Sequence, residues 1–105
     1  MQRVGFQLQV DPTRIAEYEE RHRQVWPRML AEITASGRRN YTIFLRPDGL
    51  LFGYFEVDDL EASTAYLAAS ETAAEWEAES AEFFTQLDGR PDQAFVGLRE
   101  VFHLD

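Results

Sequence analysis

A stripe of apolar and aromatic side chains at helical spacing runs through residues 11–37 and limits the folds open to this chain more than any other feature. Asp11 is a good N-cap, because its short side-chain oxygen can accept a hydrogen bond from a free backbone N–H. Pro12 suits the first helical position, where no N–H is needed. This spacing predicts a helix with one buried face. The stripe consists of Ile15, Tyr18, His22, Val25, Met29 and Ile33.

The same segment predicts where the helix breaks. Pro27 lacks an N–H and clashes with the carbonyl four residues earlier, so the helix should kink or restart near Trp26. Gly37 favours the left-handed conformation that ends many helices, so we expect two helical pieces. The charged residues of the first piece fall largely outside the stripe and are expected on a solvent-exposed face: Arg14, Glu17, Glu19, Glu20, Arg21 and Arg23.

Three segments show the residue pattern of β-strands. Residues 3–10 alternate, with Val4, Phe6, Leu8 and Val10 on one face. Residues 39–46 and 50–57 are rich in β-branched and aromatic side chains, and the turn residues 47–49 between them predict a hairpin. Both faces of this hairpin carry bulky side chains. We therefore expect its second face to line a ligand cavity, a subunit interface or both.

The remaining residues are expected to form two helices and a last strand. Asp58 or Asp59 can cap a helix over residues 60–69, and Ser70 can cap another that runs to about Leu87. A break at residues 88–92 precedes extended character over 95–104.

The order of these elements predicts an α+β domain of the ferredoxin-like βαββαβ class with an antiparallel sheet. Helices would cover one face of that sheet. Two such sheets packed face to face in a homodimer, as a dimeric α+β barrel, would cover the apolar second face.

Length and composition narrow the class of protein. With 105 residues, of which 45% are hydrophobic, the chain is expected to form one domain over residues 1–105. A net charge of −9 argues against nucleic acid or an anionic membrane as partner. Cysteine is absent, and no apolar run is long enough for a signal peptide or a membrane span. We expect a cytoplasmic protein.

The familiar motifs for phosphate binding, metal binding and serine or cysteine catalysis do not occur, so no cofactor is implied. Only His22 and His103 could supply imidazole ligands, and no carboxylate cluster has convincing spacing, so we expect no metal site. His103 lies next to Phe102 and Leu104 near the C-terminus, where a structural role is the simplest expectation.

His22 is the stronger candidate for chemistry, because imidazole titrates near neutral pH and can both donate and accept a proton. Tyr18 lies one helical turn before it. The aromatic rings of Tyr18, Tyr41, Trp26 and Trp76 would suit the C–H faces and hydroxyl groups of a sugar. The same residues would also suit an ordinary aromatic core, and the spacing alone does not distinguish the two.

Several stretches together resemble one known family. They are EYEERHRQVWPRM around Tyr18 and His22, the residues Asn40, Tyr41 and Ile43, LLF at 50–52, Trp76, and the ending LREVFHL. This set is similar to the L-rhamnose mutarotases over nearly the whole chain.

The resemblance implies a ferredoxin-like dimer that interconverts the α and β anomers of L-rhamnose, or of a close deoxyhexose, without a cofactor. It implies that His22 donates the proton and that Tyr18, Tyr41 and Trp76 contact the sugar. Glu77 departs from the family, which often has a second aromatic residue there. It is a candidate to bind a sugar hydroxyl in place of the ring, but we favour a solvent-exposed position, because charged residues on helices are mostly exposed.

Two other functions remain open. One is a cofactor-independent monooxygenase of the dimeric α/β-barrel type, and the other is a non-catalytic dimer that binds a small molecule. A sugar site needs several polar groups that converge around His22, whereas a monooxygenase site should be more apolar and shaped for a flat ring. The proton donor's partner in mutarotation could be a water, Tyr18 or a carboxylate.

Overall fold

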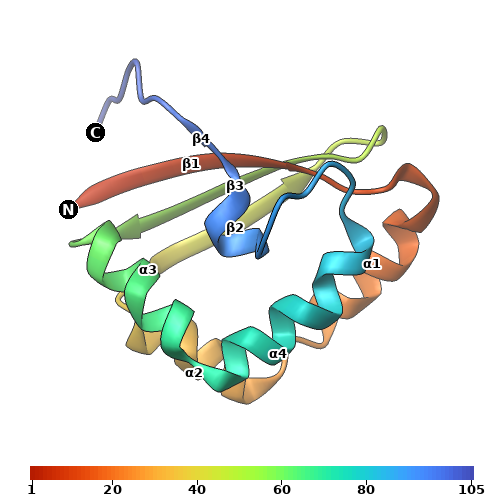
Figure 1. The fold of residues 1–105 in the computed structure, drawn as a ribbon. Helices are drawn as coiled ribbons and strands as arrows, with labels where there is room; N and C mark the ends of the chain where they lie inside the picture. Colours follow the sequence, from red (N-terminus) through yellow and green to blue (C-terminus); the bar gives the residue numbers. More distant parts are fainter.

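A four-stranded antiparallel sheet carries helices on one of its faces in the computed structural model, which describes residues 1–105 (Figure 1). The strands lie in the order β2-β3-β1-β4, which confirms the predicted ferredoxin-like α+β arrangement. The elements are β1 (Gln2–Gln9), η1 (Pro12–Arg14), α1 (Ile15–Arg23), α2 (Pro27–Ala35), β2 (Arg39–Leu45), β3 (Leu50–Val57), α3 (Leu60–Ala69), α4 (Glu71–Ser80), η2 (Ala81–Phe83), α5 (Pro91–Ala94) and β4 (Val96–Leu98).

The predicted break in the first helical segment is confirmed. Asp11 caps η1 by accepting a hydrogen bond from the Thr13 backbone N–H at 2.9 Å, and η1 leads into α1. Pro27 is the first residue of α2, where its missing N–H costs nothing. Gly37 has a φ of +93° and ends α2. The break lets α1 pack against the sheet through Tyr18 while α2 packs against α3 and α4 through Met29.

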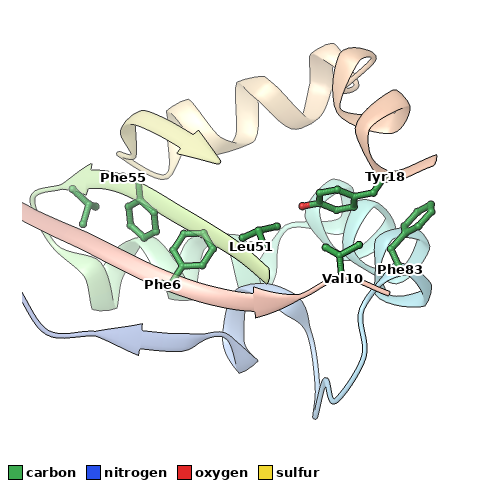
Figure 2. Packing of buried hydrophobic residues seen from close by; sticks show 7 residues of the cluster. Phe6, Val10, Tyr18, Leu51, Phe55 and Phe83 are labelled. Atoms are coloured by element: carbon green, nitrogen blue, oxygen red, sulfur yellow. The ribbon is translucent and has the colours of Figure 1, made fainter. Parts of the chain in front are cut away.

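Two apolar clusters form the core. The first lies between the inner face of the sheet and α1, and Figure 2 shows the ring of Tyr18 in the same layer as Phe6, Leu51 and Phe55 from the strands. The second forms where α2, α3 and α4 meet, and contains Met29, Leu67, Ala73 and Trp76. Both clusters depend on the stripe predicted from the sequence, because Tyr18 belongs to one and Met29 to the other.

Helix α4 is shorter than predicted. It ends at Ser80, and η2 continues it only to Phe83, rather than to Leu87. Phe84 instead forms a β-bridge with Val10, and backbone hydrogen bonds link Asp11 N to Phe83 O and Thr85 N to Gln9 O, each at 2.8 Å. The backbone pairing with the end of β1 therefore replaces the last helical turn.

The last strand is also shorter than predicted. It spans Val96–Leu98, because only Gly5 to Gln7 of β1 pair with it. Residues 91–94, which overlap the end of the predicted break at 88–92, form the short helix α5. The tail after β4 projects away from the sheet (Figure 1) and contains His103, which lies outside any strand and contacts Asp105. Val101, Phe102 and Leu104 in this tail are exposed.

The outer face of the β2–β3 hairpin carries exposed apolar side chains, as its residue pattern predicted. Phe44 is 63% exposed and Phe52 is 41% exposed, whereas Leu51 and Phe55 of the same hairpin are fully buried on the inner face. None of the helices combines the length and the apolar character needed to cross a membrane.

Candidate active site

A cavity of about 640 Å³ is bounded by the inner face of the sheet and by residues of α1, α2 and α4. Trp26, one of the aromatic rings considered for a sugar, lies outside this lining and packs against the Trp76 ring with centroids 5.1 Å apart. The other five residues singled out from the sequence line the cavity, although they come from three different elements. They are Tyr18, His22, Tyr41, Trp76 and Glu77. The fold therefore brings the predicted set together around one space.

The orientation of His22 is fixed by the preceding turn of α1. Its Nδ1 lies 3.0 Å from the backbone oxygen of Tyr18, and the two rings pack with centroids 4.3 Å apart. Because a carbonyl oxygen only accepts, Nδ1 carries a proton in this contact. The neutral imidazole then has a free lone pair on Nε2, which is the form of a general base.

Burial lowers the pKa of His22 below its ordinary value, and the nearby positive charge of Arg21 acts in the same direction. The hydrogen bond to Tyr18 opposes this shift but does not reverse it. Neutral imidazole is therefore the resting form of His22 at neutral pH. Burial also raises the pKa of the Tyr18 phenol, so that its hydroxyl stays protonated and can donate a hydrogen bond.

Arg21 does not lie on the solvent-exposed face, so that expectation is wrong for this residue. Its guanidinium carbon lies 3.8 Å from the centroid of the Trp76 ring, and the guanidinium donates to Trp76 O and Ser80 Oγ, each at 3.0 Å. A cation stacked on an indole is a favourable arrangement, and it holds the ring in place. The rings of Trp76 and His22 lie nearly perpendicular to each other, with centroids 5.8 Å apart.

Tyr41 reaches the cavity because β2 is irregular next to it. The register of β2 against β3 shifts between Arg39 and Thr42, and Asn40 has a φ of +51°. Asn and Asp adopt this left-handed conformation more readily than other non-glycine residues, and the Asn40 amide also donates to Glu56 Oε1 at 2.8 Å. The Tyr41 ring stacks on Phe55 with centroids 5.2 Å apart. The bulge therefore sets where this ring enters the site.

Glu77 is buried, with 5% of its surface exposed, so the solvent-exposed position that we favoured is wrong. Its carboxylate accepts hydrogen bonds from Arg90 Nε at 3.0 Å and from the Asp92 backbone N–H at 2.9 Å. A charged side chain is rarely buried unless it has such a partner. Arg90 lies 13 positions along the chain, so the helical pattern around Glu77 gives no sign of it.

Sequence reasoning also missed Arg38 and Asp92, which both line the cavity. They form an ion pair in which the Arg38 side chain is 1% exposed and the Asp92 side chain 13% exposed. They lie 54 positions apart, and Asp92 falls in the segment that was predicted only as a break. No spacing rule could have joined them.

The structure contains no group of three or more His, Cys, Asp or Glu side chains arranged to hold a metal ion. Polar groups from four parts of the chain nevertheless converge on the cavity. They include His22, Arg38, Asn40, Glu77 and Asp92. Fifteen of the 24 residues that line the cavity are hydrophobic, so the lining offers apolar surface beside these polar groups, as a ligand with both C–H faces and hydroxyl groups requires.

Comparisons with known proteins agree with this chemistry. The family model described as L-rhamnose mutarotase matches residues 3–104. The L-rhamnose mutarotases of Oceanobacillus iheyensis and Opitutus terrae are 38% and 39% identical to the chain, and each comparison covers the whole of both proteins. The crystal structure of an L-rhamnose mutarotase from Formosa agariphila matches the whole fold with a TM-score of 0.83, at 26% sequence identity.

Proposed function

The chain belongs to the L-rhamnose mutarotase family and is therefore a sugar mutarotase, which is a kind of isomerase. We propose that His22 carries out the proton transfer of this reaction in the cavity described above. The proposed substrate is L-rhamnose or a close deoxyhexose. A monooxygenase and a non-catalytic binder are not favoured, because the family and its relatives carry the name of a sugar isomerase.

The reaction needs only a proton to move from one oxygen of the sugar to another. In the ring-opening step the anomeric hydroxyl loses its proton, the bond between C1 and the ring oxygen breaks, and the ring oxygen gains a proton. The aldehyde then turns about its bond to C2, and the reverse steps close the ring as the other anomer. No electron is transferred, so the chemistry requires no redox cofactor.

We propose that Nε2 of His22 serves both halves of this transfer. The neutral imidazole first accepts the proton of the anomeric hydroxyl, and the imidazolium formed then donates it to the ring oxygen. Both sugar oxygens are bonded to C1, so one nitrogen can serve both. The observation that supports this assignment most directly is the contact of Nδ1 with Tyr18 O at 3.0 Å, because it leaves Nε2 free for the substrate.

The other predicted residues are proposed to hold the sugar while C1 turns. The rings of Tyr41 and Trp76 offer apolar faces for its C–H groups, and the protonated Tyr18 hydroxyl can donate to a sugar oxygen. Glu77 is proposed to accept a hydrogen bond from a sugar hydroxyl with the part of its carboxylate that Arg90 and Asp92 leave open.

Saturation-difference NMR on L-rhamnose tests the catalytic assignment, because it reports exchange between anomers directly. His22→Asn should keep the fold and lose about 10²–10⁴-fold in exchange rate, since asparagine can hydrogen-bond but cannot transfer a proton near neutral pH. His103→Asn is the matched control, because His103 lies outside the cavity, and it should exchange at the wild-type rate. A folded His22→Asn protein with the wild-type rate would remove His22 from the mechanism.

We also propose that the protein is a homodimer that packs through the outer face of its sheet. Phe44, Phe52 and Val96 leave an apolar surface there, and the tail after β4 offers further exposed apolar residues. Phe44→Asp should shift a dimer towards monomer in light scattering, because it places a charge in the buried interface. A wild-type protein that is monomeric at micromolar concentration would contradict this packing.

The cytoplasmic location also stays a proposal. Its support is the absence of cysteine, which suits a reducing compartment. Recovery of the protein in a membrane or exported fraction after cell fractionation would contradict it.

A further inference from the structure

We propose that Asp92 is a sugar-binding residue, positioned by Arg38 and Glu77, and that it selects substrates by their hydroxyl pattern. This inference rests on the proposed function, because it assumes that a sugar occupies the cavity. It assigns roles to Arg38 and Asp92, to which neither helical spacing nor the family resemblance pointed.

Arg38 fixes the carboxylate of Asp92. Each of its two terminal nitrogens donates a hydrogen bond to a different oxygen of that carboxylate, and its Nε donates to Ser63 Oγ at 2.8 Å. The guanidinium carbon also lies 4.2 Å from the centroid of the Phe55 ring. With partners on its edge and on its face, Arg38 has little freedom to move, and a two-point contact sets the plane of the carboxylate that it binds.

Glu77 fixes the backbone of Asp92. Its Oε1 accepts the Asp92 N–H at 2.9 Å, while its Oε2 accepts from Arg90 Nε at 3.0 Å. Arg90 in turn donates to the carbonyl oxygens of Leu67 and Ala68 at the end of α3. The start of α5 is thus tied to α3 and α4, and Asp92 is held at both its backbone and its side chain.

The hydrogen-bonding capacity that is left over distinguishes Asp92 from Glu77. A carboxylate can accept about four hydrogen bonds. Glu77 already accepts three, two from Arg90 and one from Asp92 N. Asp92 accepts only two, both from Arg38, and it borders the cavity. Asp92 therefore has the larger free capacity, and sugar hydroxyl groups are the donors that would match it.

A purely structural ion pair would be the simpler explanation, since such pairs also occur where they only hold a fold together. Two features favour a binding role. The Arg38–Asp92 pair lines the same cavity as His22. The free acceptor positions belong to Asp92, whose side chain is held by Arg38 and whose backbone is held by Glu77. A preorganised acceptor binds a hydroxyl at a lower entropic cost than a mobile one.

The test measures anomer exchange with L-rhamnose and with analogues that each lack one ring hydroxyl. Asp92→Asn should raise KM for L-rhamnose about 10–100-fold, as expected for a lost hydrogen bond to a charged group, while kcat changes less than about threefold. For one analogue, the KM of the wild-type protein should already be raised about as much as Asp92→Asn raises it for L-rhamnose. Asp92→Asn should not raise the KM for that analogue any further, because the mutation and the missing hydroxyl remove the same hydrogen bond.

Glu77→Gln should raise KM less than Asp92→Asn does, because glutamine keeps an acceptor oxygen for the sugar hydroxyl proposed at Glu77 and loosens Asp92 without removing it. Glu75→Gln on the same helix is the matched control, since Glu75 pairs with Arg28 at the surface, and its KM should equal that of wild type. If Asp92→Asn does not fold, Arg38→Gln combined with Asp92→Asn carries the same test, because it leaves no unpaired buried charge.

Two results would overturn the proposal. One is a folded Asp92→Asn protein whose KM for L-rhamnose equals that of wild type. The other is a KM that Asp92→Asn raises by the same factor for every analogue as for L-rhamnose, because the mutation and the missing hydroxyl would then act independently. Neither result depends on His22, so they can be told apart from a failure of the catalytic assignment, which appears as an unchanged exchange rate in His22→Asn.

Discussion

The cavity has two contrasting walls. One, here called the histidine wall, consists of Tyr18, His22 and Trp76, and its side chains are aromatic rings in mutual contact. The other, the ion-pair wall, consists of Arg38, Glu77 and Asp92, which line the cavity, together with Arg90, which pairs with Glu77 from outside the lining. The histidine wall has one group that titrates near neutral pH, and the ion-pair wall has four charges that neutralise one another.

The difference shows how one small cavity can separate two tasks. His22 has no carboxylate partner that would raise its pKa, so burial lowers its pKa and keeps the imidazole neutral. A neutral imidazole can accept the proton that the reaction moves. Each charged group of the ion-pair wall has a partner of opposite sign, so this wall suits recognition and stability rather than proton transfer. The contrast predicts which wall each mutation should affect.

The largest effect on stability is expected from Arg38→Met. Methionine keeps much of the apolar bulk, but it leaves the carboxylate of Asp92 without its partner in a largely buried position. Breaking such a pair lowers the free energy of unfolding by about 3–5 kcal/mol. Urea denaturation at one fixed protein concentration measures it, because association would otherwise change the apparent stability.

Arg23→Met is the control for this comparison. Arg23 pairs with Glu20 on the outer side of α1, where its side chain is 63% exposed, so the change should cost less than about 1 kcal/mol. Equal losses in the two variants would mean that the ion-pair wall has no special role in stability.

The two walls also differ in how well the sequence predicts them. Tyr18 and His22 lie one turn apart on one helix, so helical spacing alone places them together, and the caps at Asp11 and Gly37 fix the helix ends. The alternation of apolar and polar residues in β1 and the turn residues between β2 and β3 predicted the sheet, because these signals also come from neighbouring residues. Each of these signals is local.

The errors arose where the structure depends on contacts between distant segments. Glu77 was expected in solvent because its burial depends on Arg90, and Arg21 was misplaced because its partner Trp76 lies on another helix. The ends of α4 and of the last strand are set by backbone pairing with β1. Family resemblance brought Tyr41 and Trp76 into the site, but it did not point to Arg38 or Asp92.

A smaller effect is expected at Asn40, whose conformation brings Tyr41 to the cavity. Asn40→Ala should lower the free energy of unfolding by about 1–2 kcal/mol, because alanine is strained at a φ of +51°. Asn40→Gly should cost less, since glycine adopts this conformation freely, although both variants lose the hydrogen bond to Glu56. If alanine and glycine destabilise the protein equally in urea denaturation, backbone strain is not what matters at this position.

The smallest effect concerns the histidine wall and appears as a dependence of stability on pH. Burial lowers the pKa of His22 in the folded protein below the value of about 6.5 that it has when unfolded. Between the two values the unfolded chain binds the proton and the folded protein does not. The stability contributed by this group is therefore complete above the unfolded pKa and is lost as the pH falls towards the folded pKa.

Carboxylates also titrate on acidification, so the prediction is made for the difference between wild type and His22→Asn. Urea denaturation at about pH 7.5 and about pH 5.5 should show that wild type loses more stability on acidification than the variant does, because only wild type has the titrating imidazole. If His22→Asn has the same pH dependence as wild type, the imidazole is not held neutral by burial, and the contrast between the two walls fails at its central residue.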